Sequence, residues 1–311
     1  MTRFGRRNPI ARIRRLFEGT KTPPPGSPRP TRVVGHRGLA RLQPENTIPS
    51  FAAALDLGAD AVETDVCLTR DGHYVLWHDN EPGARVSLAR GIGAEMYAYR
   101  AAWPNLLDPR RRPVYEMTLA EMREICGYAP SKDVVSNLLN PDDPVVPFAL
   151  LEDLIRWSAD EPRLAEVFLD IKLLAEHADR APPLLDAIAA RRADLAFRFL
   201  LPERELWDAF RGKELPPGVM LAGDFELPGV VEDVEETGIR HVSMGYTPTR
   251  TWGDFQRELS EVVAARDEGM FETLTVWTVN DEDKLRALVD ARLDAIITDE
   301  PALLRSLLGG S

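Results

Sequence analysis

Two histidines and two acids near the start of the chain have the types and spacing needed for acid–base and metal chemistry. His36 and His78 each follow a short apolar run typical of a strand. Glu63 and Asp65 are two residues apart in Val62–Val66, so on a strand both side chains point to the same face. Imidazoles titrate near neutral pH and can donate or accept a proton. Together, the four residues predict a catalytic site.

The acid pair also predicts a metal ion. Two carboxylates that face inward from an apolar strand repel each other and lose hydration unless they are paired. One hard divalent cation, Mg²⁺ or Ca²⁺, satisfies both through oxygen ligands. The alternative is an exposed edge strand with both acids in water. The apolar flanks of the pair argue against it: Ala61, Val62, Val66 and Leu68.

A second pair with the same spacing is Asp170 and Lys172, which continues the apolar run 167–169. One interpretation is a buried ion pair between the two residues. The other joins them to the first pair of acids. Asp170 is then a third metal-binding carboxylate, and Lys172 contacts an anion of the substrate. The residues alone leave both interpretations open.

These side chains must be positioned by the surrounding elements. Strands are expected at 32–36, 61–67, 73–78, 165–171, 195–200, 218–223, 239–244, 273–279 and 294–298. Helices are expected at 47–57, 118–126, 148–159, 174–192, 203–211, 229–237, 254–269 and 282–291. Such alternation indicates a parallel sheet with helical crossovers, an α/β fold. Eight or nine units over about 270 residues predict a TIM (β/α)₈ barrel, whose strand ends at one face carry the active site.

Two segments break this alternation. The expected strands 61–67 and 73–78 are joined by a short linker containing Asp71-Gly72, a hairpin signal, whereas neighbouring parallel strands need a crossover. The count of nine strands leaves room for one outside the barrel. Residues 80–147 contain one clear helix and are rich in Gly, Pro, Arg and aromatic residues. We expect an insertion there, after the third strand, acting as a lid or specificity element.

Seven short motifs, taken in order, resemble the glycerophosphodiester phosphodiesterase family. They are Gly35-His36-Arg37-Gly38, Pro44-Glu45-Asn46-Thr47, Glu63-x-Asp65, His78-Asp79, Asp170-Ile171-Lys172, Val276-Trp277-Thr278-Val279-Asn280 and Ile297-Thr298-Asp299-Glu300-Pro301. The resemblance covers about residues 32–305 and is weakest in the insertion. No single motif is specific, but the combination is. Asn46 is also expected to cap the helix at 47–57.

The resemblance implies metal-dependent hydrolysis of glycerophosphodiesters to glycerol 3-phosphate and an alcohol, through a cyclic phosphate. By the same resemblance, His36 and His78 are the general acid and base, and Arg37 contacts the phosphate. Glu63 and Asp65 would bind one divalent metal ion.

The third metal ligand of the family is normally Glu. This chain has Asp170 there, one methylene shorter. Trp277 is expected at the barrel mouth, where it could pack on the glycerol or head group; ordinary barrel packing is the alternative.

Two other functions stay open at this point. One is a phospholipase D-like hydrolase of lysophospholipids or sphingolipids, similar to the sphingomyelinase D group, which has Asp at the third ligand but lacks Pro-Glu-Asn-Thr. It needs an apolar groove, which the insertion could supply with Met96, Tyr97, Tyr99, Trp103, Leu106 and Leu107. The other is a barrel that binds a phosphorylated ligand without turnover.

Composition and charge limit the partners and the compartment. The 311-residue chain has a formal net charge of −12, which argues against a broad nucleic-acid-binding surface. The resemblance implies a small-molecule phosphodiester as the partner instead. Two cysteines exclude a disulfide scaffold and a four-cysteine zinc site. They fit a reducing compartment, so we expect a cytoplasmic protein.

The N-terminal segment differs from the rest. Residues 1–32 contain nine Lys or Arg and one acid, and 23–30 are rich in proline. We expect residues 1–30 to form a flexible basic arm and 31–311 to form the barrel. Apolar residues at helical spacing between 10 and 17 could bring the arm into peripheral contact with an anionic membrane surface. A solvated, disordered arm is the alternative.

Overall fold

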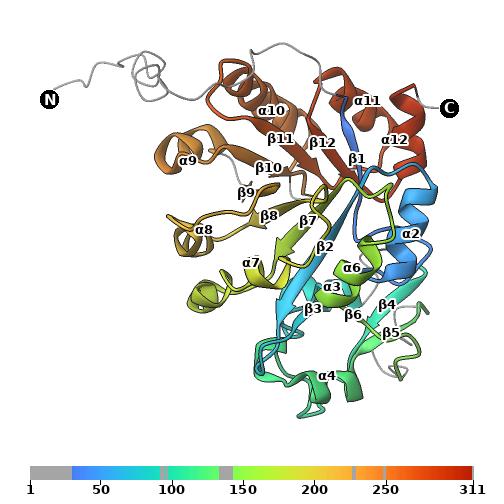
Figure 1. The fold of residues 1–311 in the computed structure, drawn as a ribbon. Helices are drawn as coiled ribbons and strands as arrows, with labels where there is room; N and C mark the ends of the chain where they lie inside the picture. Colours follow the sequence, from blue (N-terminus) through green and yellow to red (C-terminus); the bar gives the residue numbers. More distant parts are fainter. Residues whose placement is uncertain are drawn as a thin grey trace, which may run out of the picture.

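Eight parallel strands form a closed barrel in the computed structural model, which describes residues 30–91, 95, 97–132, 143–225, 229–247 and 250–309 (Figure 1). The barrel strands are β1 (Arg32–Gly35), β2 (Ala61–Leu68), β7 (Glu166–Ile171), β8 (Ala196–Leu201), β9 (Val219–Phe225), β10 (His241–Gly245), β11 (Thr273–Trp277) and β12 (Ala295–Thr298). Strand β1 pairs with both β12 and β2, which closes the sheet. The predicted TIM barrel is confirmed. The expected basic arm lies outside the described residues.

Helices surround this barrel (Figure 1). They are α2 (Ile48–Asp56), α6 (Leu151–Ser158), α7 (Leu184–Ala187), α8 (Arg204–Phe210), α9 (Val230–Thr237), α10 (Trp252–Asp267), α11 (Glu282–Asp290) and α12 (Pro301–Leu307). The long helix expected at 174–192 is wrong. A 3₁₀ helix, η2 (Ala175–Arg180), and the short α7 stand there instead, because Pro182 and Pro183 lack the N–H groups that a continuous helix needs.

Alternation along β2 directs its two acids into the barrel. All eight residues of β2 are buried, as expected for a strand covered on both faces. Ala61 belongs to an apolar layer inside the barrel, whereas Val62 and Val66 pack in the core between strands and helices. Because side chains alternate, Glu63 and Asp65 share the inner face with Ala61.

The expected third strand lies outside the barrel. It is β3 (Tyr74–Leu76), which pairs antiparallel with β2 and then with β6 (Ala149–Leu150). The turn between β2 and β3 contains Gly72, whose φ of 90° suits glycine. The hairpin returns the chain along β2, so that the Trp77 N–H donates to the Asp65 carbonyl at 3.1 Å. His78 follows directly and is therefore brought to the level of the acids.

The insertion after β3 is a small folded unit. It contains α3 (Arg85–Gly91), β4 (Tyr99–Ala102), η1 (Val114–Glu116), α4 (Leu119–Ile125) and β5 (Gly127–Pro130). Strands β4 and β5 form a separate antiparallel sheet, which lies with α4 at the lower end of the molecule in Figure 1. Buried residues of the insertion, including Trp103, Met122 and Tyr128, share an apolar cluster with Trp77. In barrel order, the insertion therefore separates the second strand, β2, from the third, β7.

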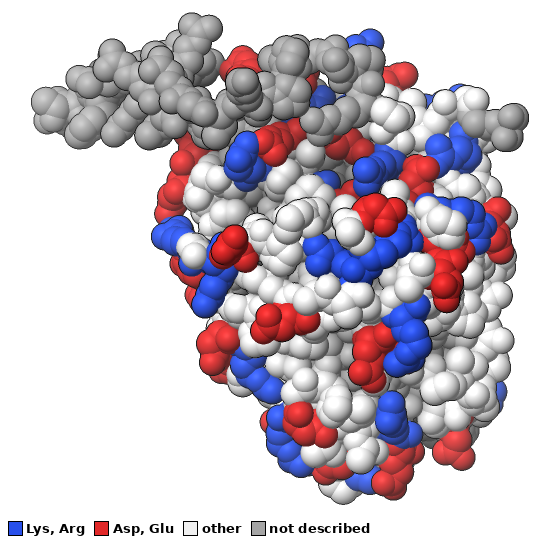
Figure 2. Space-filling model, viewed as in Figure 1, with Lys and Arg blue, Asp and Glu red and all other residues white. Residues whose placement is uncertain are grey.

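Acidic and basic side chains are interspersed over the face shown in Figure 2. Exposed acids and bases of the described residues form ion pairs, for example Arg163 with Asp56 and Arg204 with Glu236. Cys67 and Cys126 are both buried and free. Among the described residues, no helix combines the length and the apolar character that a bilayer span requires.

Candidate active site

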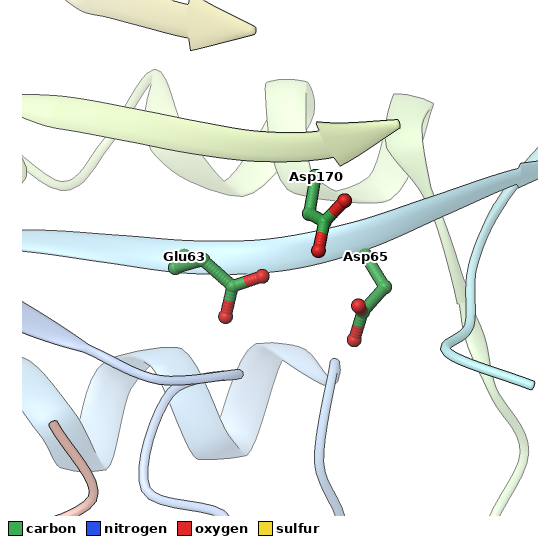
Figure 3. A group of neighbouring side chains, drawn as sticks. All are labelled: Glu63, Asp65 and Asp170. Atoms are coloured by element: carbon green, nitrogen blue, oxygen red, sulfur yellow. The ribbon is translucent and has the colours of Figure 1, made fainter. Parts of the chain in front are cut away.

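Three carboxylates converge at the mouth of the barrel. Glu63 and Asp65 come from β2 and Asp170 comes from the adjacent β7, where it pairs in register with Asp65. Their ligand atoms lie within 4.8 Å of one another. Figure 3 shows the three side chains pointing into the same space from the two neighbouring strands. The residue types and their proximity are those predicted from the sequence.

This cluster has a surplus of negative charge and an unsatisfied oxygen. Burial and the neighbouring Asp65 raise the pKa of Glu63 to about 8. The buried Oδ1 of Asp170 accepts no hydrogen bond from the described residues. A divalent cation would stabilise the ionised form of Glu63 and give that oxygen a partner. The all-oxygen donor set therefore fits Mg²⁺ or Ca²⁺.

Lys172 lies within the same cluster. Its Nζ is 2.6 Å from Oδ2 of Asp170 and 3.3 Å from Oδ1 of Asp65. These two carboxylates, acting against the effect of burial, raise the pKa of Lys172 well above its ordinary range. The two interpretations of the Asp170–Lys172 spacing are thus compatible. The residues form an ion pair, and that ion pair is part of the candidate metal site.

Arg37 is held by several carboxylates beside this cluster. Its Nε lies 3.1 Å from Oδ2 of Asp65, and one terminal nitrogen lies 2.9 Å from Oε2 of Glu45 and 3.1 Å from Oε2 of Glu95. The Arg37 backbone has a φ of 50°, and its N–H donates to Oε2 of Glu63 at 2.9 Å. A strained backbone of this kind often marks a functional loop.

Asn46 supports the acids rather than helix α2, so its predicted capping role is wrong. The N-cap of α2 is Thr47, which makes no side-chain capping bond. Asn46 instead donates from Nδ2 to Oδ2 of Asp65 at 2.9 Å, and its Oδ1 accepts from Oγ1 of Thr64 at 2.7 Å. Its φ of 56° turns the side chain back toward β2. Asn46 therefore fixes the orientation of one candidate metal ligand.

His36 is paired with an acid that directly follows the last barrel strand. Its Nδ1 lies 2.8 Å from Oδ1 of Asp299, and its Nε2 lies 4.0 Å from Oε2 of Glu63. Asp299 also accepts hydrogen bonds from Asn280 at 2.6 Å and from Tyr97 at 3.1 Å. Burial and Arg37 alone would lower the pKa of His36, but Asp299 and Glu63 outweigh them and raise it above 6.5.

His78 is paired with the acid that follows it. Its Nδ1 lies 2.8 Å from Oδ1 of Asp79, and the same oxygen accepts from Arg90 at 2.7 Å. Burial, together with Arg37 and Arg90, holds the pKa of His78 well below its usual range. The two histidines therefore have pKa values shifted in opposite directions, a pattern typical of an acid–base pair.

A cavity of about 430 Å³ joins these groups. Its lining includes seven of the eight predicted site residues: His36, Arg37, Glu63, His78, Asp170, Lys172 and Trp277. The eighth, Asp65, is 1% exposed and does not line the cavity. The volume of this cavity suits a small organic molecule.

The family comparison agrees with this geometry. The model of the glycerophosphoryl diester phosphodiesterase family matches residues 36–198, just over half of the chain. The chain belongs to this family. The resemblance identified from the seven motifs is confirmed, and so is the predicted enzyme class, a phosphoric diester hydrolase.

The relatives of this family member differ in their sequence identity to it and in the share of each chain that is covered. An uncharacterised Bacillus subtilis protein, YqiK, is 24% identical over 282 residues, 89% of this chain and 98% of that protein. A glycerophosphodiester phosphodiesterase from Caldanaerobacter subterraneus is 55% identical over 49 residues, 16% of this chain and only 20% of that enzyme. An Oleispira antarctica phosphodiesterase, solved with the product sn-glycerol-3-phosphate, has the same fold, with a TM-score of 0.62, 17% identity and coverage of 90% and 97%.

Several residues at the candidate site had been given no role by the sequence analysis. Asp79, Asn280 and Asp299 stand in the quoted motifs, and their position beside the predicted histidines and Trp277 was the available signal. Arg90, Glu95 and Tyr97 come from the insertion, where no motif marks them. Asp224 also lines the cavity and has no motif around it.

Proposed function

We propose that this protein hydrolyses glycerophosphodiesters to glycerol 3-phosphate and an alcohol. The observation that supports this most directly is the shared cavity: two histidines, each bonded to its own carboxylate, border one cluster of three acids. The geometry suits a phosphodiester, because its reaction needs a proton acceptor, a proton donor and stabilisation of negative charge.

One divalent cation, Mg²⁺ or Ca²⁺, would be held by Glu63, Asp65 and Asp170. When bound, it supplies positive charge that stabilises the phosphate oxygens in the transition state. Lys172 and Arg37 line the cavity beside the acids and would donate to the same phosphate oxygens. Arg37 does so by exchanging a carboxylate partner for phosphate; Glu95, whose side chain is 29% exposed, is the most accessible of the three.

The first step uses the opposite pKa shifts of the histidines. His78, neutral at pH 7, accepts the proton of the glycerol hydroxyl next to the phosphorylated carbon. That oxygen bonds to phosphorus, and the bond from phosphorus to the head-group oxygen breaks. His36, protonated, donates its proton to the leaving alcohol. The product of this step is a cyclic phosphate of glycerol.

The second step reverses these roles. His36, now neutral, accepts a proton from water as the water oxygen bonds to phosphorus. His78, now protonated, donates to the ring oxygen whose bond to phosphorus breaks, which leaves glycerol 3-phosphate. Asp299 and Asp79 hold the two rings in place throughout, since each bonds to Nδ1 and leaves Nε2 for the proton transfers.

A lipid substrate is the second candidate, and the apolar groove that it requires finds little support. The Tyr97 hydroxyl donates a hydrogen bond to Asp299, and Trp103 is buried in the core of the insertion. Leu107 is 93% exposed. Met96 lies outside the described residues. Tyr97, Tyr99, Trp103 and Leu106 line one cavity of the insertion, but its volume is only about 60 Å³, and Arg90, Glu95 and Arg111 also line it. A space this small and this charged does not suit an acyl chain, so the glycerophosphodiester assignment stands first.

A substrate comparison tests the proposal. The purified protein is supplied with Mg²⁺ or Ca²⁺ and assayed separately on glycerophosphocholine and on lysophosphatidylcholine. We expect glycerol 3-phosphate and choline from the first substrate and much slower turnover of the second. Preferential hydrolysis of the lysolipid would favour the phospholipase D-like function, and inertness on every glycerophosphodiester would favour a binding protein.

We also propose that the basic N-terminal arm contacts anionic membranes peripherally. The charge of residues 1–32 supports this, because clustered Arg and Lys side chains are attracted to anionic lipid. Binding to vesicles that contain phosphatidylserine should then fall as salt is raised. If the 311-residue chain did not bind such vesicles at low salt, the proposal would be contradicted.

A further inference from the structure

Asp224 is a buried acid in the catalytic cavity to which neither the motifs nor the proposed reaction gives a role. It lies near the end of β9, pairs in register with Ser243 of β10 and is 8% exposed. In the closed order of the barrel strands, β9 is four strands from β1 in either direction. Asp224 and His36, which follows β1, therefore line opposite walls of the same cavity.

Trp277 of β11 reaches Asp224 across the intervening strand β10 because Gly245 makes room for its ring. A Cβ atom on Gly245 would lie 2.9 Å from Cζ2 of Trp277. The indole extends over the glycine of β10 and donates from Nε1 to Oδ1 of Asp224 on β9 at 2.6 Å. One oxygen of the carboxylate is thus fixed by the tryptophan, and the ring and the acid form one rigid unit at the cavity wall.

This unit has the chemistry of a polyol subsite. An indole packs well on a carbon chain while its N–H orients a polar partner. A buried carboxyl group needs hydrogen-bond partners, and a hydroxyl of a bound substrate can be one of them.

We propose that Asp224 and Trp277 bind the glycerol moiety, with Asp224 accepting a hydrogen bond from the terminal hydroxyl, the one farthest from phosphorus. This inference rests on the proposed function. The phosphate belongs beside the acids of β2 and β7, and the hydroxyl next to the phosphorylated carbon belongs beside the histidines. The terminal hydroxyl is then the group that can reach the opposite wall.

A pair of substrates isolates this contact. The first is a glycerophosphodiester, and the second is the same diester of propane-1,2-diol, which keeps the hydroxyl next to the phosphorylated carbon and lacks the terminal one. The ratio of their kcat/KM values measures the terminal hydroxyl. Because a site built around a substrate hydroxyl discriminates strongly, we expect the native protein to prefer glycerol by about tenfold to a hundredfold.

Asp224→Asn should lower this ratio by about tenfold or more, so that the two substrates are hydrolysed with similar kcat/KM values. Trp277→Phe keeps an aromatic ring but removes the N–H that fixes the carboxylate, so it should lower the same ratio to a smaller extent. Asp208→Asn changes an exposed acid outside the cavity and should leave the ratio at its native value. Thermal unfolding of each variant shows that the ratio is measured on folded protein.

Two results would overturn the inference. One is a folded Asp224→Asn variant that keeps the native ratio of the two kcat/KM values. The other is a variant that keeps the ratio but changes its preference among head groups, for example glycerophosphocholine against glycerophosphoglycerol, because Asp224 would then bind the other side of the substrate. Failure of the proposed function looks different: the native protein would turn over neither member of the substrate pair.

Discussion

Oδ1 of Asp299 lies 2.8 Å from Nδ1 of His36, so the first and the last strands of the barrel meet in one acid–imidazole pair. The carboxylate is itself fixed by Asn280 and by Tyr97 from the insertion. This pairing keeps His36 protonated to a higher pH than an ordinary histidine. In the proposed reaction, the protonated form is the acid that releases the alcohol.

Replacing Asp299 should therefore change the alkaline side of the pH profile. In Asp299→Asn the pKa of His36 falls, so the protonated acid is lost at a lower pH. The alkaline limb of kcat/KM should move to lower pH, and turnover at pH 8 should fall by about tenfold or more. Asp283→Asn, an exposed acid on α11, is the matched control. A folded Asp299→Asn with the native alkaline limb would contradict the pairing.

Metal binding should release a proton from Glu63. Without a cation, the pKa of about 8 leaves this carboxyl largely protonated at pH 7, and a ligand to Mg²⁺ or Ca²⁺ must be ionised. Calorimetric titration at pH 7 in two buffers of different ionisation enthalpy should report close to one proton released. The release should vanish at pH 9, where Glu63 is already ionised. Equal heats in both buffers at pH 7, or undiminished release from Glu63→Gln, would refute this.

The sequence was sufficient for most of the barrel because its patterns are local. Alternation along β2 and the apolar runs of the other strands predicted the strands to within a few residues. The short hairpin between β2 and β3 showed that a crossover was missing, but only pairing in space shows that β3 leaves the barrel. Helix α12, absent from the expected elements, begins at Pro301, which is favourable at a first turn.

The residues of the candidate site also fall into two groups: those that local sequence patterns predict and those that only contacts in space show. Acids that stand in strand motifs, such as Glu63, Asp65 and Asp170, could be predicted as site residues from the sequence alone. Asp224 could not, because its meaning comes from its contact with Trp277, 53 positions along the chain. Arg90 could not either, since one arginine among many in the insertion has no local signal; its importance lies in the acids that it meets in space.

Arg90 should couple the insertion to catalysis. Its guanidinium donates to Asp79 at 2.7 Å and to Glu95 at 2.7 Å, and its side chain is 8% exposed. Arg90→Met leaves the buried Asp79 without a cationic partner, although His78 still bonds to it, and should cost about 3–5 kcal/mol of unfolding free energy. It also removes a positive charge that lowers the pKa of His78. The acid limb of kcat/KM should therefore move to higher pH.

Arg90→Lys keeps the charge and should restore part of both effects. Arg85→Met changes an exposed arginine on the same helix, and we expect little change in either measurement. If denaturant unfolding and the pH profile of Arg90→Met matched those of Arg85→Met, the proposed link between the insertion and His78 would be wrong.

Gly245 should be needed for the position of Trp277. The φ of Gly245 does not lie in the left-handed region, so the effect of a substitution is steric. Gly245→Ala places a methyl group against the indole ring and should lower stability by roughly 1–3 kcal/mol while raising KM more than it lowers kcat. In Gly253→Ala, the added methyl meets only Arg257, at 3.9 Å, and the variant should be neutral or slightly more stable. An unchanged KM in Gly245→Ala would show that the ring does not contact the substrate.

The most direct test of the central claim follows glycerol 3-phosphate formed from glycerophosphocholine by the metal-supplied native protein, His36→Ala and His78→Ala. Metal binding is measured separately by calorimetry for all three. The account predicts turnover by the native protein and a loss of about 10²–10⁴-fold in each variant that still binds metal. Near-native turnover in either metal-bound variant would contradict it.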